Sequence, residues 1–189
     1  MSSRSLREKA LSALNRFMDE SPNQDDIIFL FHQLRNDPND RAVALIAACI
    51  IDDILEISIL TKFRHLNSDE RKRLFDPDQP LSSFSAKIRI AYALDLIDRP
   101  QQQNLDCVRS IRNAFAHITR PLEFRHPIVV DVCRYLHTDP RFGSDPEQAR
   151  ARYIWAVMDI IEKLTDMNIK RRFPDGILPA SLSPLPHKR

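Results

Sequence analysis

The chain of 189 residues is long enough for one ordinary domain with a hydrophobic core. Hydrophobic residues make up 43% and charged residues 29% of it, a globular balance that excludes a disordered chain, and the formal net charge of +2 is too small to indicate a nucleic-acid-binding protein. The chain has only two glycines, Gly143 and Gly176. Because sheet-rich folds need many turn residues with positive φ, this scarcity predicts an all-α fold.

The first elements in the chain are expected to be two short helices. Ser5 to Glu8 have the spacing of a capping box, and apolar residues follow at helical spacing until Pro22 ends the element. A second helix is expected from Asp25 or Asp26.

The third and longest helix is predicted over about Asp40 to Arg64. Its first half, Ala42 to Ile51, is apolar nearly all round and must be buried on most sides. Its second half carries acidic residues, of which Asp52 and Glu56 lie four apart on one face. Buried carboxylates need cationic partners, and we expect an arginine from another helix. The candidates for this structural ion-pair cluster are Asp52, Asp53, Glu56, Arg109 and Arg112.

Capping and proline signals place the remaining helices. A short helix is predicted between Asn67 and Phe75, a loop at residues 76–80, and a helix from about Ala86 to Ile97. Ser82, Ser83 and Ser85 are expected to cap that helix rather than to act as nucleophiles, although the backbone amides there could hold an anion. Pro100 predicts the first turn of the next helix, and His126-Pro127 predicts the start of another. Ser144 to Glu147 predict the start of a long last helix. Trp155 on this last helix is expected in the core or at a dimer interface.

These elements make about seven or eight helices in one bundle-like domain over residues 1–172, with a Pro-rich extended tail over residues 173–189. The cysteines, Cys49, Cys107 and Cys133, are odd in number and widely spaced, which predicts small buried hydrophobic side chains in a reducing compartment.

No metal or cofactor is expected, because the histidines lack ligand spacing and no glycine-rich phosphate loop exists. No signal peptide precedes the first helix, and the longest apolar run is too short to span a bilayer, so we expect a cytoplasmic protein without a membrane partner.

The segment Arg112-Asn113-Ala114-Phe115-Ala116-His117 concentrates chemically useful side chains near the end of a predicted helix. One interpretation is catalytic: Arg112 holds the phosphate of a phosphodiester, with Asn113 beside it, and His117 moves a proton in metal-independent RNA cleavage. The other is structural: Arg112 pairs with the acidic residues and His117 ends the helix. On a regular helix Arg112 and His117 lie roughly 140° apart, so catalysis by the pair requires a distorted last turn or a second chain.

Two resemblances bear on this choice. The Arg-x4-His spacing of Arg112 and His117 resembles the signature of the HEPN superfamily, helical dimers that include ribonucleases and many inactive members. Three blocks of the chain, Arg41 to Glu56, Pro80 to Ile97 and Leu105 to His117, resemble the mannitol operon repressor (MtlR) family. This second resemblance covers about Asp40 to His117, with weaker similarity through Leu136 and in the last helix.

The MtlR resemblance implies an all-helical cytoplasmic transcription regulator, a repressor of a mannitol or related sugar-alcohol uptake operon. No helix-turn-helix is recognisable, so we expect action mainly through other regulatory or transport-system proteins, with direct DNA binding as a lesser alternative. We also expect a homodimer, because an apolar helix face is available for a second copy. The alternative function is a HEPN-type ribonuclease or RNA-binding protein that uses Arg112, Asn113 and His117.

Overall fold

The computed structural model describes residues 8–13, 29, 32–138 and 145–172. All regular elements in these ranges are helices, as the composition predicts. Residues 8–13 are helical and belong to a compact unit formed by residues 1–32, whereas the helices below belong to the unit formed by residues 33–189. Residues 29 and 32–36 of the predicted second helix are helical, whereas its start near Asp25 and the tail over residues 173–189 lie outside the described residues.

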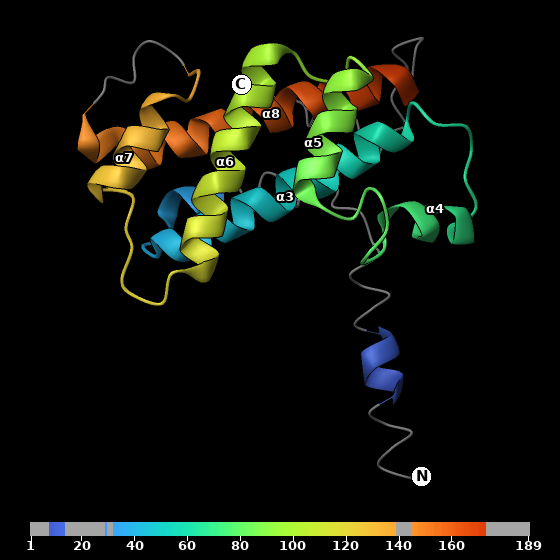
Figure 1. Cartoon of the computed structure of the whole chain (residues 1–189), viewed down its shortest axis with the longest axis horizontal. Helices are drawn as coiled ribbons and strands as arrows, with labels where there is room; N and C mark the ends of the chain where they lie inside the picture. The colour runs from blue at the N-terminus through green and yellow to red at the C-terminus, as the bar shows by residue number, and fades with distance from the viewer. Residues whose placement is uncertain (1–7, 14–28, 30–31, 139–144, 173–189) are drawn as a thin grey trace, which may run out of the picture. The chain divides into compact units, whose positions relative to one another are not determined.

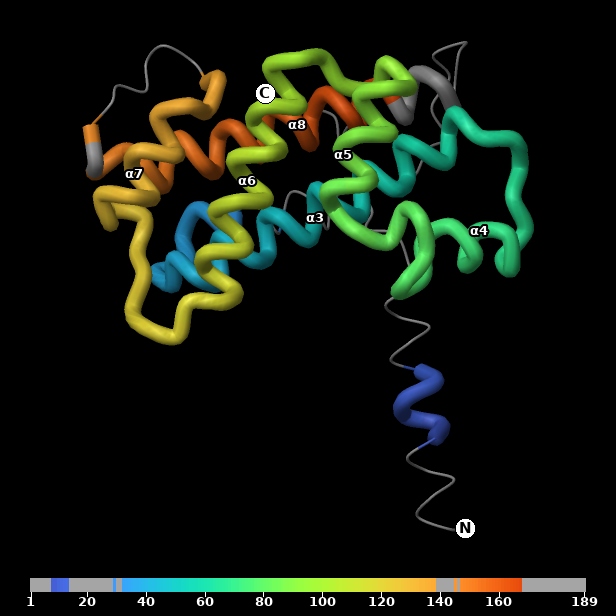
Figure 2. Tube along the Cα trace, viewed as in Figure 1, coloured from blue at the N-terminus to red at the C-terminus, as the bar shows by residue number. Residues whose placement is uncertain are grey.

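From residue 40 onward, the described part of the second unit contains six α-helices. They are α3 (Asp40–Leu60), α4 (Ser68–Phe75), α5 (Phe84–Ala93), α6 (Arg99–His117), α7 (Pro127–Arg134) and α8 (Ala149–Arg172), the last preceded by a 3-10 turn over Pro146–Gln148. The hairpin of α5 and α6 lies across α3, and α6 also packs on α8 (Figure 1). Helices α3 and α8 form the layer behind this hairpin, and α7 packs on α8 (Figure 2).

Helix α3 forms the centre of the core. Small residues on it, Ala44, Ala47 and Ala48, are at most 2% exposed and allow neighbouring helices to approach closely. The Tyr153 hydroxyl of α8 donates a hydrogen bond to the carbonyl of Ala44 at 3.0 Å. Burial raises the pKa of Tyr153 far above its usual value, so this hydroxyl remains protonated and keeps α8 in register with α3.

Local capping signals are confirmed at three helix starts. Asn67 forms a reciprocal capping box with Glu70 at the start of α4, and Ser83 accepts the Ala86 N–H at the start of α5. Asp98 forms a second box with Gln101 at the start of α6, where Pro100 occupies the first turn as predicted.

Two helices end earlier than predicted. Helix α3 ends at Leu60 rather than Arg64, where the Ser58 and Thr61 hydroxyls bond to backbone carbonyls at 2.7 Å and compete with the helical pattern. Helix α5 ends at Ala93 rather than Ile97. There Asp95 takes a left-handed conformation, φ 52°, and Leu96 bonds back to the carbonyl of Ala91, which is the Schellman geometry with aspartate where glycine is usual.

The prediction that all three cysteines are buried is wrong in part. Cys133 is buried and Cys107 is half-buried, but Cys49 is exposed. Trp155 on α8 is 48% exposed and is therefore not a core residue, and its place at a dimer interface stays a prediction. Within the described part of the chain, no helix is long and apolar enough to cross a membrane.

Candidate functional site

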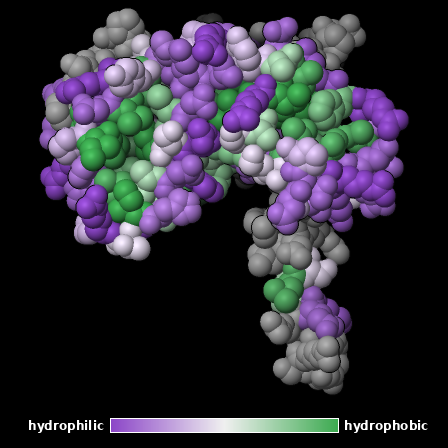
Figure 3. Space-filling model, in the orientation of Figure 1, coloured by the Kyte–Doolittle hydropathy of each residue, from purple (hydrophilic) through white to green (hydrophobic). Residues whose placement is uncertain are grey.

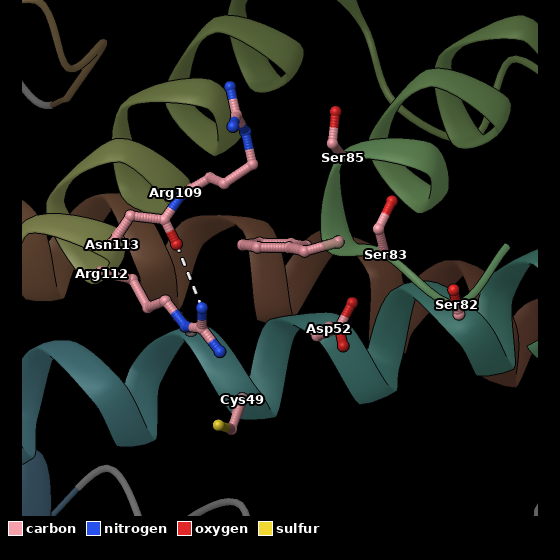
Figure 4. A pocket seen from close by; sticks show the side chains of 10 residues that line it. Cys49, Asp52, Ser82, Ser83, Ser85, Arg109, Arg112 and Asn113 are labelled. Carbon is pink, nitrogen blue, oxygen red and sulfur yellow. Dashed lines mark hydrogen bonds between the residues drawn. The ribbon is translucent and has the colours of Figure 1, made fainter. Parts of the chain in front are cut away.

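A pocket of about 370 Å³ opens between α3 and the hairpin of α5 and α6. Three segments far apart in the sequence line it: Cys49 and Asp52 on α3, residues 82–85 at the start of α5, and Arg109 with residues 112–113 on α6 (Figure 4). Its volume lies at the lower end of the range for small-molecule sites. The motif helix predicted from the sequence therefore contributes Arg112 and Asn113 to a real cavity.

Helix α6 supplies two guanidinium groups to the pocket. Arg109 and Arg112 lie three residues apart and therefore project from neighbouring positions on one side of the helix. The Nη1 of Arg112 donates to the side-chain oxygen of Asn113 at 3.0 Å, the contact drawn in Figure 4. Arg109 lies 3.7 Å from Asp106. Neither arginine forms an ion pair with Asp52, Asp53 or Glu56 in the described part of the chain.

The partner of the acidic cluster is Lys87 of α5. Its Nζ lies 3.2 Å from Asp52 and 2.9 Å from Glu56, and its side chain is 6% exposed. Glu56 also receives the guanidinium of Arg71 from α4, at 2.8 Å. The expected arginine from another helix is therefore present for Glu56, but it comes from α4, and the candidates Arg109 and Arg112 do not pair with this cluster.

The cluster perturbs the pKa values of its members. Burial raises the pKa of Asp52 above its usual value, and the charge of Lys87 offsets only part of that rise. Partial desolvation on the surface of α3 and the charge of Asp52 likewise raise the pKa of Asp53. Burial alone would lower the pKa of Lys87, but the charges of Asp52 and Glu56 outweigh it and raise that pKa. Lys87 therefore stays charged at neutral pH.

Lys87 was not among the residues that the sequence singled out. The signal for it was its spacing: it precedes Ala91 by four residues and so shares the buried face of α5, where Ile88 also lies. A lysine on a buried face implies a carboxylate opposite it.

Comparison with known proteins finds the same helical fold in solved structures. No protein-family model matches the chain, and no curated protein matches it either. Two solved structures are similar. One is described as a possible transcriptional regulator, YggD, from Shigella flexneri, with 15% identity, a TM-score of 0.58, and coverage of 77% of this chain and 99% of that one. The other is MtlR in its complex with HPr from Escherichia coli, with 19% identity, a TM-score of 0.51, and coverage of 75% of this chain and 94% of that one.

His117 lies apart from the pocket that Arg112 lines. Helix α6 is regular as far as His117, whose side chain is exposed and lies outside the pocket lining. The chain then turns away, and Arg41 of α3 donates to the carbonyl of Ile118 at 2.7 Å. The last turn is therefore undistorted, and a single chain does not bring Arg112 and His117 onto one substrate. In the described residues no three His, Cys, Asp or Glu side chains gather as a metal site.

Proposed function

We propose that this chain is a transcription regulator of the MtlR kind, a repressor of a mannitol or related sugar-alcohol uptake operon that acts through protein–protein contacts. The observation that carries the proposal is the fold, which it shares with YggD and with MtlR in complex with HPr. The partner we propose is accordingly HPr of the same organism. The polar residues at the start of α6 form hydrogen bonds within the protein, which supports a mechanism in which this helix does not contact DNA bases.

Residues 101–104, Gln-Gln-Gln-Asn, are the polar run that a DNA-reading helix would need. In this fold they serve the protein itself. Gln101 is 8% exposed and accepts the Asp98 N–H, and Asn104 is 2% exposed and holds the backbone of His137 through two hydrogen bonds. The side chain of Gln102 is hydrogen-bonded to Arg99, and that of Gln103 is hydrogen-bonded to the ring of His137. The two buried side chains, Gln101 and Asn104, are therefore not free to bond to base edges.

The arrangement of α5 and α6 also argues against direct reading of DNA. In Figure 1 α5 and α6 run side by side in opposite directions, whereas the two helices of a DNA-binding helix-turn-helix cross at a steep angle. The proposed regulation therefore requires a surface for another protein.

Helix α7 carries an exposed apolar face. Ile128 is 66% exposed and Tyr135, which ends the helix, is 75% exposed, with half-buried Val132 between them. Figure 3 shows hydrophobic surface over this helix. Arg152 of α8 donates to carbonyls at the end of α7, including that of Cys133 at 3.0 Å, so the face is presented from a fixed position. Exposed apolar patches of this kind are typical of protein contacts.

Deletion of the gene, followed by transcript sequencing, tests the proposal. We expect transcripts of a sugar-alcohol uptake operon to rise in the deletion strain and to return to normal when the wild-type gene is restored. A Tyr135→Ala allele should fail to restore repression, whereas Tyr92→Ala, which truncates a 39% exposed tyrosine on α5, should succeed. Unchanged transcripts of every such operon would contradict the proposed function.

A further inference from the structure

The pocket between α3, α5 and α6 presents hydrogen-bond donors that the protein leaves without acceptors. A guanidinium has five N–H donors, and Arg112 uses one of them on Asn113. Among the described residues no other acceptor meets its side chain. Arg109 bonds still less, since its nearest carboxylate, on Asp106, is 3.7 Å away and 55% exposed.

A buried donor of Arg109 is also unsatisfied. Its Nε has almost no accessible surface and no hydrogen-bond partner in the structure. A buried donor without an acceptor is costly, and native structures keep few of them. Because this Nε has almost no accessible surface, it does not itself meet a ligand, and the donors that Arg109 can offer to the cavity are those of its terminal nitrogens.

The start of α5 adds donors on the opposite wall. The Ser83 hydroxyl caps the Ala86 N–H, and the first intrahelical bond runs from the Lys87 N–H to the carbonyl of Ser83. The backbone N–H groups of Phe84 and Ser85 come before this bond and have no acceptor among the described residues. The Ser85 hydroxyl lines the same cavity (Figure 4).

The charge of the pocket is positive in spite of Asp52. This carboxylate lines the cavity; its Oδ2 is paired with Lys87 at 3.2 Å, whereas its buried Oδ1 has no hydrogen-bond partner, so Asp52 offsets part of the positive charge. Two guanidinium charges, on Arg109 and Arg112, have no comparable partner. A phosphate monoester carries a charge of about −1.5 to −2 and three acceptor oxygens, which matches this pair better than a single carboxylate does.

From these observations we infer that the pocket binds a small phosphate monoester, with the phosphoryl group held between Arg109, Arg112 and the start of α5. The cavity of about 370 Å³ has room for a small organic group beside the phosphate but not for a large ligand. This inference goes beyond the proposed function and does not depend on it, because it concerns a ligand of this chain rather than a partner protein.

Calorimetric titration of the full chain with glucose 6-phosphate, inorganic phosphate and glucose tests the inference. We expect saturable binding of the ester at one site, at least as tight as that of inorganic phosphate, and no binding of glucose. Arg112→Gln should weaken binding roughly tenfold or more, because it removes charged hydrogen bonds to the phosphoryl group. Arg89→Gln makes the same change of charge at an exposed position of α5 outside the pocket and should leave the affinity unchanged.

Ser85→Glu separates loss of binding from loss of folding. A carboxylate in the first turn of α5 favours the helix, so the melting temperature should hold or rise, while the added charge should abolish phosphate binding. A Ser85→Glu variant that melts at the same or a higher temperature but no longer binds phosphate supports the site. No saturable binding of the ester at millimolar concentration, equal losses in Arg112→Gln and Arg89→Gln, or binding of inorganic phosphate alone would overturn it.

Discussion

Replacing Lys87 by methionine tests the structural part of this account. Lys87→Met removes the cation between Asp52 and Glu56 but keeps an unbranched side chain that can pack against Phe75, whose ring centroid lies 5.9 Å from Nζ. Breaking a buried ion pair costs about 3–5 kcal/mol. The carboxylates here are 29% and 15% exposed, and Glu56 keeps Arg71, so we expect a smaller cost, about 2–3 kcal/mol. For a chain of this length that corresponds to roughly 4–12 °C in melting temperature.

The pH dependence of this cost follows from the same contacts. Without Lys87, the already raised pKa of Asp52 rises further, so the folded state of the variant loses stability as pH increases and Asp52 ionises. Urea unfolding should therefore show a larger cost at pH 8 than at pH 5. The wild-type pKa of Lys87 is raised above its usual 10.5, so the stabilisation by Lys87 is complete below pH 10.5 and is lost as pH rises through the higher folded value.

An exposed ion pair on α8 provides the matched control. Lys163 lies 2.7 Å from Asp159, and both side chains are about half exposed. Lys163→Met should cost about 0.5 kcal/mol or less. If Lys87→Met costs no more than Lys163→Met, or if its cost is independent of pH, the argument that Lys87 compensates the acidic half of α3 is refuted.

Three further predictions concern capping, thiol reactivity and the ribonuclease alternative. Ser83→Ala removes the cap of the Ala86 N–H and should lower the free energy of unfolding by about 1 kcal/mol in urea titration, whereas no change would refute the capping role. Iodoacetamide should label Cys49 first, then Cys107 and last Cys133, as followed by peptide mass spectrometry, because exposure falls in that order. Burial raises the pKa of Cys133 to about 12, so faster labelling there than at Cys49 would contradict the fold. Mixed RNA in EDTA should remain intact with the wild-type protein and with His117→Ala alike, and cleavage lost in the variant would revive the catalytic interpretation.

The parts of the fold that local chemistry determines could be predicted from the sequence. The start of α4 depends on Asn67 and Glu70, and the start of α6 on Asp98 and Pro100, each of which acts within one helical turn. The end of α5 could not be predicted in this way, because Asp95 takes the left-handed position that a glycine would have marked.

The candidate site could be predicted only in part, because it is built from three separate segments. The sequence marked Arg112 and Asn113 by their position beside His117, yet the structure places only the first two at the pocket. The pairing of Asp52 with Lys87 joins residues 35 positions apart and depends on how α5 crosses α3. Helical spacing identifies the face on which a residue lies, but it does not determine which face of another helix packs against it.

Sedimentation velocity of the full chain with HPr of the same organism tests whether the chain acts through this partner. We expect a complex that sediments faster than either protein, that is weakened by Tyr135→Ala and that is unaffected by Tyr92→Ala. Separate sedimentation of the two proteins at roughly 100 μM each would contradict regulation through this partner. So would a steeply salt-dependent shift of operator DNA by the chain alone, since that would indicate direct DNA binding.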